Sequence, residues 1–254
     1  MNLVILKIGG SVITEKGSVS SAKKPEIERI SHEIASFKKE ADLDLILVHG
    51  AGSFGHPQAI NWVKEGFDAK GVYLIHSSVN ILNSMVLDSL NNAGVNALPV
   101  HPLSGSLLED GRLIELQVEK IKLMLERGIV PVLHGDVVMD RKRGAAILSG
   151  DRIVPYLASV MNASQIGAGT DVDGVLDEKG TVIKKITPMS FIDMKKSIQG
   201  SGTTDVTGGM LGKVSEFLEL AKKGISSRIF NASKKDMVSK FLYGEDVGTL
   251  ITDK

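Results

Sequence analysis

The sequence has no cysteine among its 254 residues. This absence excludes a disulfide framework, a thiolate metal site and a cysteine nucleophile, and it is compatible with a reducing compartment. Proline-rich linkers and internal repeats are lacking as well. With nothing in the sequence to divide it, we expect residues 1–254 to form a single domain.

An excess of charge is also absent, because 30 Lys and Arg residues balance 30 Asp and Glu residues. Without net positive charge or a long basic block, binding to nucleic acid or to a membrane surface is disfavoured. No apolar stretch approaches the ~18 residues of a membrane span. The first apolar run, 3–8, is interrupted by Lys7 and is too short for the core of a signal sequence. We therefore expect a cytoplasmic protein with neither a nucleic-acid nor a membrane partner.

Short apolar runs alternate with longer segments of helical periodicity. The runs are nearly continuously apolar, which is typical of parallel strands covered on both faces. The strands that we predict are 3–8, 43–49, 96–101, 129–138 and 165–169, with weaker candidates at 181–186, 227–231 and 249–252.

Apolar residues recur at helical spacing between these strands. We predict one helix that follows Pro25 and three further helices over 75–86, 118–125 and 214–221. Glycines follow the last three of them at the position where a glycine commonly ends a helix: Gly94, Gly128 and Gly224. Strands alternating with helices predict an α/β fold, a three-layer αβα sandwich with a central, mostly parallel sheet.

Glycine is in clear excess, with 27 of 254 residues or about 11%, against an average of ~7%. The informative glycines follow strands and precede helices, which places them at the ligand-binding carboxyl edge of a parallel sheet. The first such loop is 7–11, KIGGS. Its glycines allow backbone N–H groups to approach an anion, and Lys7 adds a positive charge. An ordinary tight turn remains the alternative.

The second glycine loop is 49–56, HGAGSFGH. It contains GxGxxG directly after a strand, as in dinucleotide-binding folds. Those folds require an acidic residue about 20 positions further on, at the end of the next strand. Here the next predicted strand begins only near Asn96. We therefore interpret the segment as a phosphate-binding loop, with His56 either donating to a phosphate or lying on the surface.

Two later loops combine glycine with charged residues. Segments 148–151 and 169–174 carry Asp151, Asp171 and Asp173 but lack the spacing of a calcium loop. Their carboxylates either cap turns or contact a nucleotide and its magnesium. Segment 205–213, DVTGGMLGK, precedes a helix and places Lys213 in its first turn. A cation is unfavourable there unless an anion lies near, so this placement indicates a phosphate.

Several familiar catalytic motifs are missing from the sequence. There is no GxxxxGK[ST] loop, no protein-kinase signature and no serine-nucleophile elbow. Six scattered histidines lack metal-ligand spacing, so no protein metal site is predicted: His32, His49, His56, His76, His101 and His134. His134 follows a strand and is a further candidate for the ligand-binding edge.

Four ordered segments resemble the amino acid kinase family: 7–11 (KIGGS), 49–52 (HGAG), 170–174 (TDVDG) and 208–213 (GGMLGK). The resemblance covers essentially the whole chain. It implies the open αβα fold of that family, with an acceptor-binding lobe over about 1–160 and an ATP-binding lobe over about 161–254.

Within the family, segments 53–56, 149–151 and 205–209 are similar to the branch that phosphorylates isopentenyl phosphate to isopentenyl diphosphate. This implies ATP as co-substrate, Mg²⁺, a small-molecule partner and a homodimer, in the archaeal-type mevalonate route of isoprene biosynthesis. Other acceptors remain open, namely a phosphonate such as fosfomycin, UMP or an amino acid. A non-catalytic nucleotide sensor also remains open.

The resemblance assigns roles position by position. It implies that ATP is bound by Lys7, Gly9, Gly10, Ser11, Gly52, Asp171, Gly209 and Lys213. It implies that the acceptor phosphate is bound by Ala51, His56 and Gly150. The catalytic set is Lys7, Lys16, Asp151 and Lys213, with Lys16 stabilising the transferring phosphoryl group and Asp151 orienting the lysines.

The implied reaction places few demands on the side chains. A monophosphate acceptor is largely a dianion at neutral pH, because its second pKa is about 6. It therefore needs no general base, and none is conspicuous. Its apolar tail needs a pocket, for which Val79, Leu82 and Met85 are candidates, although core packing explains most of them.

Overall fold

The computed structural model describes residues 3–41, 43–192, 194 and 209–254. Its first half contains β1 (Leu3–Ile8), α1 (Gly10–Ile13), α2 (Lys24–Glu40), β2 (Asp44–His49), the 3-10 turn η1 (Gly52–Phe54), α3 (His56–Glu65), α4 (Ala69–Asn92), β3 (Ala97–Pro99), α5 (Pro102–Gly105), β4 (Ser106–Glu109), β5 (Arg112–Leu116) and α6 (Val118–Leu125). The second half contains β6 (Val130–His134), β7 (Asp136–Asp140), β8 (Gly144–Leu148), α7 (Gly150–Met161), β9 (Gln165–Thr170), β10 (Lys185–Ile186), α9 (Gly209–Ala221), β11 (Ser226–Asn231), α10 (Met237–Leu242) and β12 (Thr249–Ile251).

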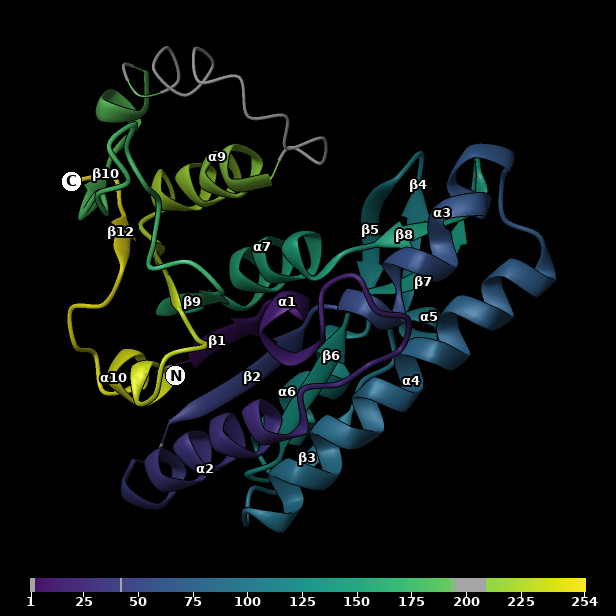
Figure 1. The fold of residues 1–254 in the computed structure, drawn as a ribbon, viewed down its shortest axis with the longest axis horizontal. Helices are drawn as coiled ribbons and strands as arrows, with labels where there is room; N and C mark the ends of the chain where they lie inside the picture. Colours follow the sequence, from purple (N-terminus) through teal and green to yellow (C-terminus); the bar gives the residue numbers. More distant parts are fainter. Residues whose placement is uncertain (1–2, 42, 193, 195–208) are drawn as a thin grey trace.

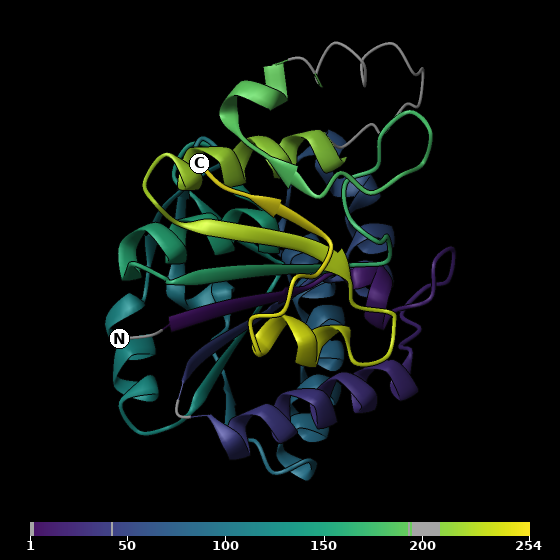
Figure 2. The ribbon, with the colours of Figure 1, turned by 90° about the vertical axis from the view of Figure 1, so that its left-hand side faces the viewer.

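Within this part of the chain, the larger sheet has eight strands in the order β10-β12-β11-β9-β1-β2-β6-β3. Neighbouring strands are parallel except for β11 and β12. Figure 2 shows these strands fanned across the view, with α9 on one side and α2 and α10 on the other. The αβα sandwich predicted from the sequence is thus confirmed.

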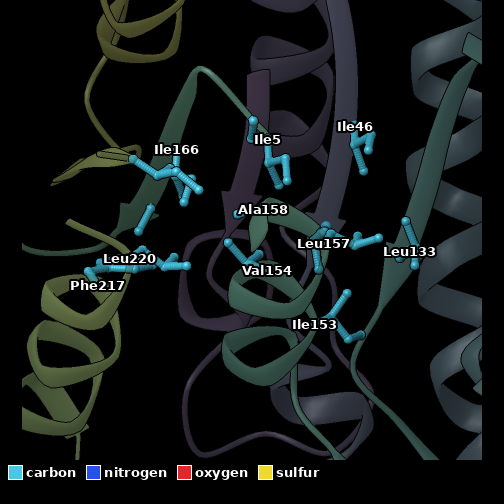
Figure 3. Close-up of a cluster of buried hydrophobic side chains, with 14 of the residues drawn as sticks. Ile5, Ile46, Leu133, Ile153, Val154, Leu157, Ala158, Ile166, Phe217 and Leu220 are labelled. Atoms are coloured by element: carbon cyan, nitrogen blue, oxygen red, sulfur yellow. The ribbon is translucent and has the colours of Figure 1, made fainter. Parts of the chain in front are cut away.

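The central strand β1 is buried on both faces, and its alternate side chains enter different layers. Leu3 and Ile5 belong to the core beneath α6, α7 and α9, whereas Val4, Leu6 and Ile8 belong to the core beneath α1, α2, α4 and α10. Figure 3 shows the first of these cores, where side chains of α7 meet those of three strands: Ile153, Val154 and Leu157 against Ile5, Ile46 and Leu133. This two-sided burial explains why the strand sequence is almost continuously apolar.

A second, four-stranded sheet has the order β5-β4-β7-β8 and lies beside α3 and α4 (Figure 1). The single strand predicted over 129–138 is wrong, because the chain ends β6 at His134, passes Gly135 and begins β7 in this other sheet. The antiparallel strand β8 then returns the chain to the start of α7. This excursion is what brings Gly150 and Asp151 back to the carboxyl edge of the large sheet.

Asp140 anchors the turns of the second sheet. Its carboxylate accepts hydrogen bonds from the backbone N–H groups of Asp110, Gly111, Lys142 and Arg143. Burial opposes ionisation, but these donors outweigh it and lower the pKa of Asp140 to about 2. The carboxylate therefore stays charged, and both hairpin turns keep their acceptor, at any pH above that value.

The other predicted elements agree with the structure in type, and several of them differ in length. Strand β10 covers only the last two residues of the predicted segment 181–186. Gly94, Gly128 and Gly224 have φ values of +93°, +67° and +80° beyond their helices, as a glycine helix stop requires. No helix within the described ranges is long and apolar enough to cross a membrane.

Candidate active site

The glycine loops gather at one edge because adjacent parallel strands end level with one another. Backbone hydrogen bonds join the loops: Gly9 N donates to Gly169 O (2.8 Å), Gly50 N to Ile8 O (2.9 Å) and Gly135 N to His49 O (3.0 Å). The parallel topology thus collects segments that are up to 160 residues apart (Gly9 and Gly169) into one surface.

The loops after β1 and β2 are in direct backbone contact. A Cβ atom on Gly10 would lie 2.4 Å from the nitrogen and 2.5 Å from the Cα of Gly52. A Cβ atom on Gly50 would lie 2.5 Å from the nitrogen of Gly10. Gly52 also has a φ of +50°, which favours glycine. The two predicted phosphate loops therefore form one interlocked unit.

Gly10→Ala is expected to lower the free energy of unfolding by about 3 kcal/mol, because the added methyl group collides with backbone atoms that have no room to move. Denaturant titration measures the change. Gly212→Ala is the matched control, since a Cβ atom there meets nothing within 4 Å, and alanine gains about 1 kcal/mol over glycine inside a helix. Equal stability of the two variants would contradict the interlocked loops.

Lys7, Asp151 and Lys213 form a charged cluster at this edge. The carboxylate Oδ1 of Asp151 lies 2.9 Å from Nζ of Lys7 and 3.9 Å from Nζ of Lys213. Only 6% of the Lys7 side chain and 15% of that of Lys213 is exposed. Burial alone would raise the pKa of Asp151, but the two ammonium groups outweigh it and lower that pKa. Asp151 is therefore a fixed anion that holds two lysines from opposite ends of the sequence.

Gly150 is the first residue of α7 and packs directly against the stem of Lys7. A Cβ atom there would lie 3.2 Å from Cε of Lys7 and 3.3 Å from Cγ1 of Val48. The glycine therefore leaves room for the extended lysine side chain below the helix N-terminus.

Lys16 lies apart from the lysine cluster. Its Nζ atom is 2.6 Å from Oδ2 of Asp171, and 73% of its side chain is exposed. Burial opposes ionisation of Asp171, but the hydrogen bond from Lys16, aided by Ser11, lowers the pKa of this carboxyl. The structure thus pairs Lys16 and Ser11 with the carboxylate predicted to lie on the nucleotide side.

The remaining predicted residues fall at the same edge. His56 begins α3, and its side chain is exposed, without a hydrogen-bond partner among the described residues. Ala51 lies in the loop before η1. Gly209 begins α9, whereas Gly208 and the rest of segment 195–208 lie outside the described residues.

Four of the six histidines, which are far apart in the sequence, meet in the structure beside the second glycine loop (49–56). Nδ1 of His76 lies 2.8 Å from the buried carboxylate of Asp136, and Nδ1 of His101 lies 3.3 Å from Nε2 of His134. The rings of His49 and His134 stack with centroids 5.6 Å apart. No set of three or more His, Asp or Glu side chains in the described ranges is placed to hold a metal ion. Hydrogen bonds and ring contacts therefore link the four histidines into one network.

The pKa shifts of these four histidines make the stability of the fold depend on pH. Burial lowers the pKa of His49, His101 and His134, whereas the hydrogen bond to Asp136 raises that of His76. At His49, His101 and His134, the unfolded chain binds more protons than the folded chain below pH ~6.5. The free energy of unfolding therefore falls as the pH falls. His76 acts oppositely, because its contribution is complete below that pH and is lost as the pH rises through its raised pKa.

We expect the free energy of unfolding to fall between about pH 6.5 and 5, by up to ~1.4 kcal/mol per pH unit for each buried histidine. Denaturant titrations at several pH values measure the slope. His134→Asn should flatten it, while His32→Ala, at an exposed site on α2, should leave it unchanged. An unaltered slope in His134→Asn would contradict this origin of the acid sensitivity.

Of the three residues considered for an apolar pocket, only Val79 lies beside the second glycine loop (49–56). It belongs to a small cluster between α3, α4 and the second sheet: Ala59, Ile75, Val79, Val137 and Ala145. A Cβ atom on Gly55 would lie 2.5 Å from Cβ of Ala51 and 3.7 Å from Cγ2 of Val79. Leu82 instead packs in the main core, and Met85 lines a groove of about 350 Å³ between α2 and α4.

Comparison with known proteins identifies the family of the chain. The model of the amino acid kinase family matches residues 2–231. The chain is 40% identical to isopentenyl phosphate kinase of Haloferax volcanii, over 99% of both chains. It is 37% identical to isopentenyl phosphate kinase of Methanothermobacter thermautotrophicus, over 99% of this chain and 100% of the other.

Solved structures include an isopentenyl phosphate kinase that superimposes with a TM-score of 0.82 at 32% identity, covering 98% of this chain and 100% of the other. The similarity thus extends over nearly the full length of the chain. The chain therefore belongs to the amino acid kinase family, and within it to the group of the isopentenyl phosphate kinases.

Proposed function

We propose that this protein transfers the γ-phosphoryl group of ATP to the phosphate of isopentenyl phosphate, which gives isopentenyl diphosphate and ADP. The observation that carries the proposal is the meeting of Lys7 and Lys213 on Asp151, between the glycine loop after β1 and the N-terminus of α7. Its support is the similarity, over nearly the full length, to kinases of that name.

The loop of Gly9 and Gly10 is the proposed cradle for the ATP phosphates. Because its glycines have no side chains, the backbone N–H groups of this loop can approach phosphate oxygens closely. Lys7 at the end of β1 and Lys213 in the first turns of α9 would supply positive charge from two sides. In this arrangement the first lobe contributes Lys7 and Asp151, and the second contributes Lys213.

Mg²⁺ fits this set of donors as a cation that arrives with the nucleotide. Magnesium is usually held by one or two carboxylates together with substrate phosphates. Two of the carboxylates described at this edge, those of Asp151 and Asp171, are each paired with a lysine, and no described group of three or more such side chains is placed to hold a metal ion. When bound, the ion would neutralise charge on the β- and γ-phosphates.

Catalysis would consist of positioning and charge neutralisation. Phosphoryl transfer passes through a loose transition state with the attacking and leaving oxygens in line, and the enzyme stabilises it electrostatically. The acceptor dianion needs no base, so the side chains only have to bind and orient it. Ala51, Gly150 and His56 are the residues that we propose to hold its phosphate, and Lys16 is proposed to approach the transferring group.

The apolar tail of the acceptor would lie against the small cluster around Val79. That cluster adjoins Ala51 and Gly55 and is separate from the two large cores. An amino acid acceptor would instead call for an arginine fork to bind its carboxylate. The apolar side chains beside Ala51 and Gly55 therefore favour an acceptor with a hydrocarbon tail.

A panel of acceptors tests the proposal. ATP consumption with Mg²⁺ is measured for isopentenyl phosphate, dimethylallyl phosphate, fosfomycin, UMP, aspartate, glutamate and acetylglutamate. We expect kcat/KM to be highest for isopentenyl phosphate. A higher value for fosfomycin, UMP or an amino acid would overturn the acceptor assignment, and ATP binding without any turnover would favour a nucleotide sensor.

A further inference from the structure

Lys16 lies on a short loop between α1 and α2. An antiparallel bridge joins Thr14 to Ala22 at the base of this loop, and residues 15–20 beyond the bridge are all exposed. Burial therefore does not hold the part of the loop that carries Lys16. Its position depends on the polar contacts that the loop makes.

Ser20, near the end of the loop, has an unusual backbone conformation. Its φ is +49°, in the left-handed region that residues other than glycine rarely adopt. Such a conformation costs free energy and persists where surrounding contacts hold it. The backbone nitrogen of Ser20 donates to the carbonyl oxygen of Ser53 at 2.9 Å, and that of Ser21 donates to Oγ of Ser53 at 3.1 Å. The second glycine loop therefore supports the backbone at Ser20.

The side chain of Ser20 belongs to a cluster of three polar side chains. Its Oγ atom lies 2.9 Å from Nε2 of Gln58 on α3 and 3.2 Å from Oγ of Ser78 on α4, and Figure 1 shows the loop extending toward α4. Nε2 of Gln58 also lies 3.1 Å from Oγ of Ser78. Because a serine hydroxyl both donates and accepts, the cluster is satisfied with either end of the Gln58 amide facing the hydroxyls. The cluster thus ties the loop of Lys16 to two helices.

The same two helices border the acceptor side of the proposed site. Helix α3 begins at His56, the residue proposed to hold the acceptor phosphate, and Gln58 follows in its first turn. On α4, Ser78 precedes Val79, which belongs to the small apolar cluster proposed for the acceptor tail. The elements that would hold the acceptor therefore also hold the loop of Lys16.

On the nucleotide side, Lys16 has a weaker hold. Its Nζ atom lies 2.6 Å from Oδ2 of Asp171, but 73% of the Lys16 side chain is exposed. An exposed ion pair contributes little free energy, so the lysine can leave Asp171 for a phosphate. The place from which Lys16 reaches that phosphate is set by the loop and not by the ion pair.

We propose that Gln58 is a positioning residue, which acts through Ser20 to hold the loop of Lys16 where this lysine reaches the phosphoryl group in transfer. Ser78 completes the hold from α4. The inference rests on the proposed function and adds side chains that act on the reaction through Lys16. It links the helix that would bind the acceptor to the placement of the lysine.

Gln58→Met keeps the length of the side chain and removes the amide. We expect kcat to fall about tenfold, as for the loss of two ordinary hydrogen bonds, because Lys16 is then in place for only part of the time. KM for ATP and for the acceptor should stay within about threefold of wild type, because the lost contact acts in the transition state. Ser78→Ala should also lower kcat, whereas Ser78→Thr keeps the hydroxyl and should stay within about twofold of wild type.

A double-mutant cycle shows whether Gln58 acts through Lys16. Lys16→Met alone should lower kcat about 10²-fold, because a donor to the transition state is removed. Adding Gln58→Met to this variant should lower kcat by less than about twofold more, because no lysine is left to position. Thermal melts check the fold of each variant, and the Ser78 pair keeps the test open if Gln58→Met fails to fold.

Hydrogen exchange measures the hold on the loop without turnover. Three backbone N–H groups of the loop are hydrogen-bonded, those of Glu15, Ser20 and Ser21. In Gln58→Met they should exchange about fivefold faster, because the loop opens more easily after the tether is lost. Exchange in β1 should be unchanged, which would show that the rest of the fold is intact.

Wild-type turnover of isopentenyl phosphate is measured first and decides the proposed function separately. If the wild type prefers another acceptor, the same cycle is measured with that acceptor. An unchanged kcat in Gln58→Met would overturn the inference, and so would a loss as large in the Lys16→Met background as in the wild type. Unchanged exchange in 15–21 would overturn it whatever the acceptor is.

Discussion

Lys7→Met is expected to lower kcat by about 10³-fold, the size of effect seen when one preorganised donor to a transition state is removed. Lys7 is the penultimate residue of β1 and is almost fully buried, and its Nζ atom lies 2.9 Å from Oδ1 of Asp151. Its ammonium group is therefore held in one place by a fixed anion, in surroundings where its charge acts strongly on a phosphate. Methionine retains a flexible stem of similar length, so the pocket beside Gly150 stays filled.

Steady-state kinetics with saturating ATP and acceptor measure this effect, and a thermal melt checks the fold. Lys185→Met is the matched control, because Lys185 is an exposed lysine on strand β10. Its kcat should stay within about twofold of wild type, as for a surface substitution away from the site. Comparable kcat values for the two variants would show that Lys7 does not act on the reacting phosphates.

His56→Ala is expected to raise KM for the acceptor about 30-fold, with a much smaller effect on KM for ATP. A hydrogen bond between a side chain and a phosphate is worth about 2 kcal/mol, which corresponds to that factor. His56 opens α3 at the end of the second glycine loop and has an exposed side chain that can reach a ligand. The loss should therefore concern acceptor binding alone.

Calorimetric titration with isopentenyl phosphate and, separately, with ATP resolves the two affinities. His32→Ala provides the control, since His32 is also an exposed histidine but lies on α2. It should bind both ligands as the wild type does. Unchanged acceptor affinity in His56→Ala would refute the assigned role.

The large sheet could be predicted from the sequence because burial on both faces makes its strands visible as apolar runs. Strand β1 was predicted with its observed bounds for this reason. The second sheet was not predicted, because β4, β5 and β8 are short, and β5 carries mostly polar or exposed residues. The predicted strand 129–138 fused two strands, because both sides of Gly135 are apolar and only the fold shows that they enter different sheets.

The site could be predicted in part, through glycine loops that follow strands. The lysine cluster was expected from the family resemblance, whereas the histidine network was missed because its members come from four separate segments of the chain: His49 on β2, His76 on α4, His101 before α5 and His134 on β6. A usable signal was present in the repeated His-Gly pairs at 49–50 and 134–135, each at the end of a strand. Hydrogen bonds between residues far apart in the sequence could not be predicted from it. An example is Glu33, whose carboxylate accepts from the backbone N–H groups of Val238 and Ser239.

Phosphorus NMR of the reaction mixture distinguishes transfer of the γ-phosphoryl group to the acceptor from its transfer to water. The protein is incubated with ATP, Mg²⁺ and isopentenyl phosphate, and the phosphorus signals are followed over time. We predict that the monophosphate signal is replaced by the two coupled signals of a diphosphate ester, in step with the formation of ADP. ADP and inorganic phosphate with the monophosphate signal intact would contradict it, because the γ-phosphoryl group would then have gone to water.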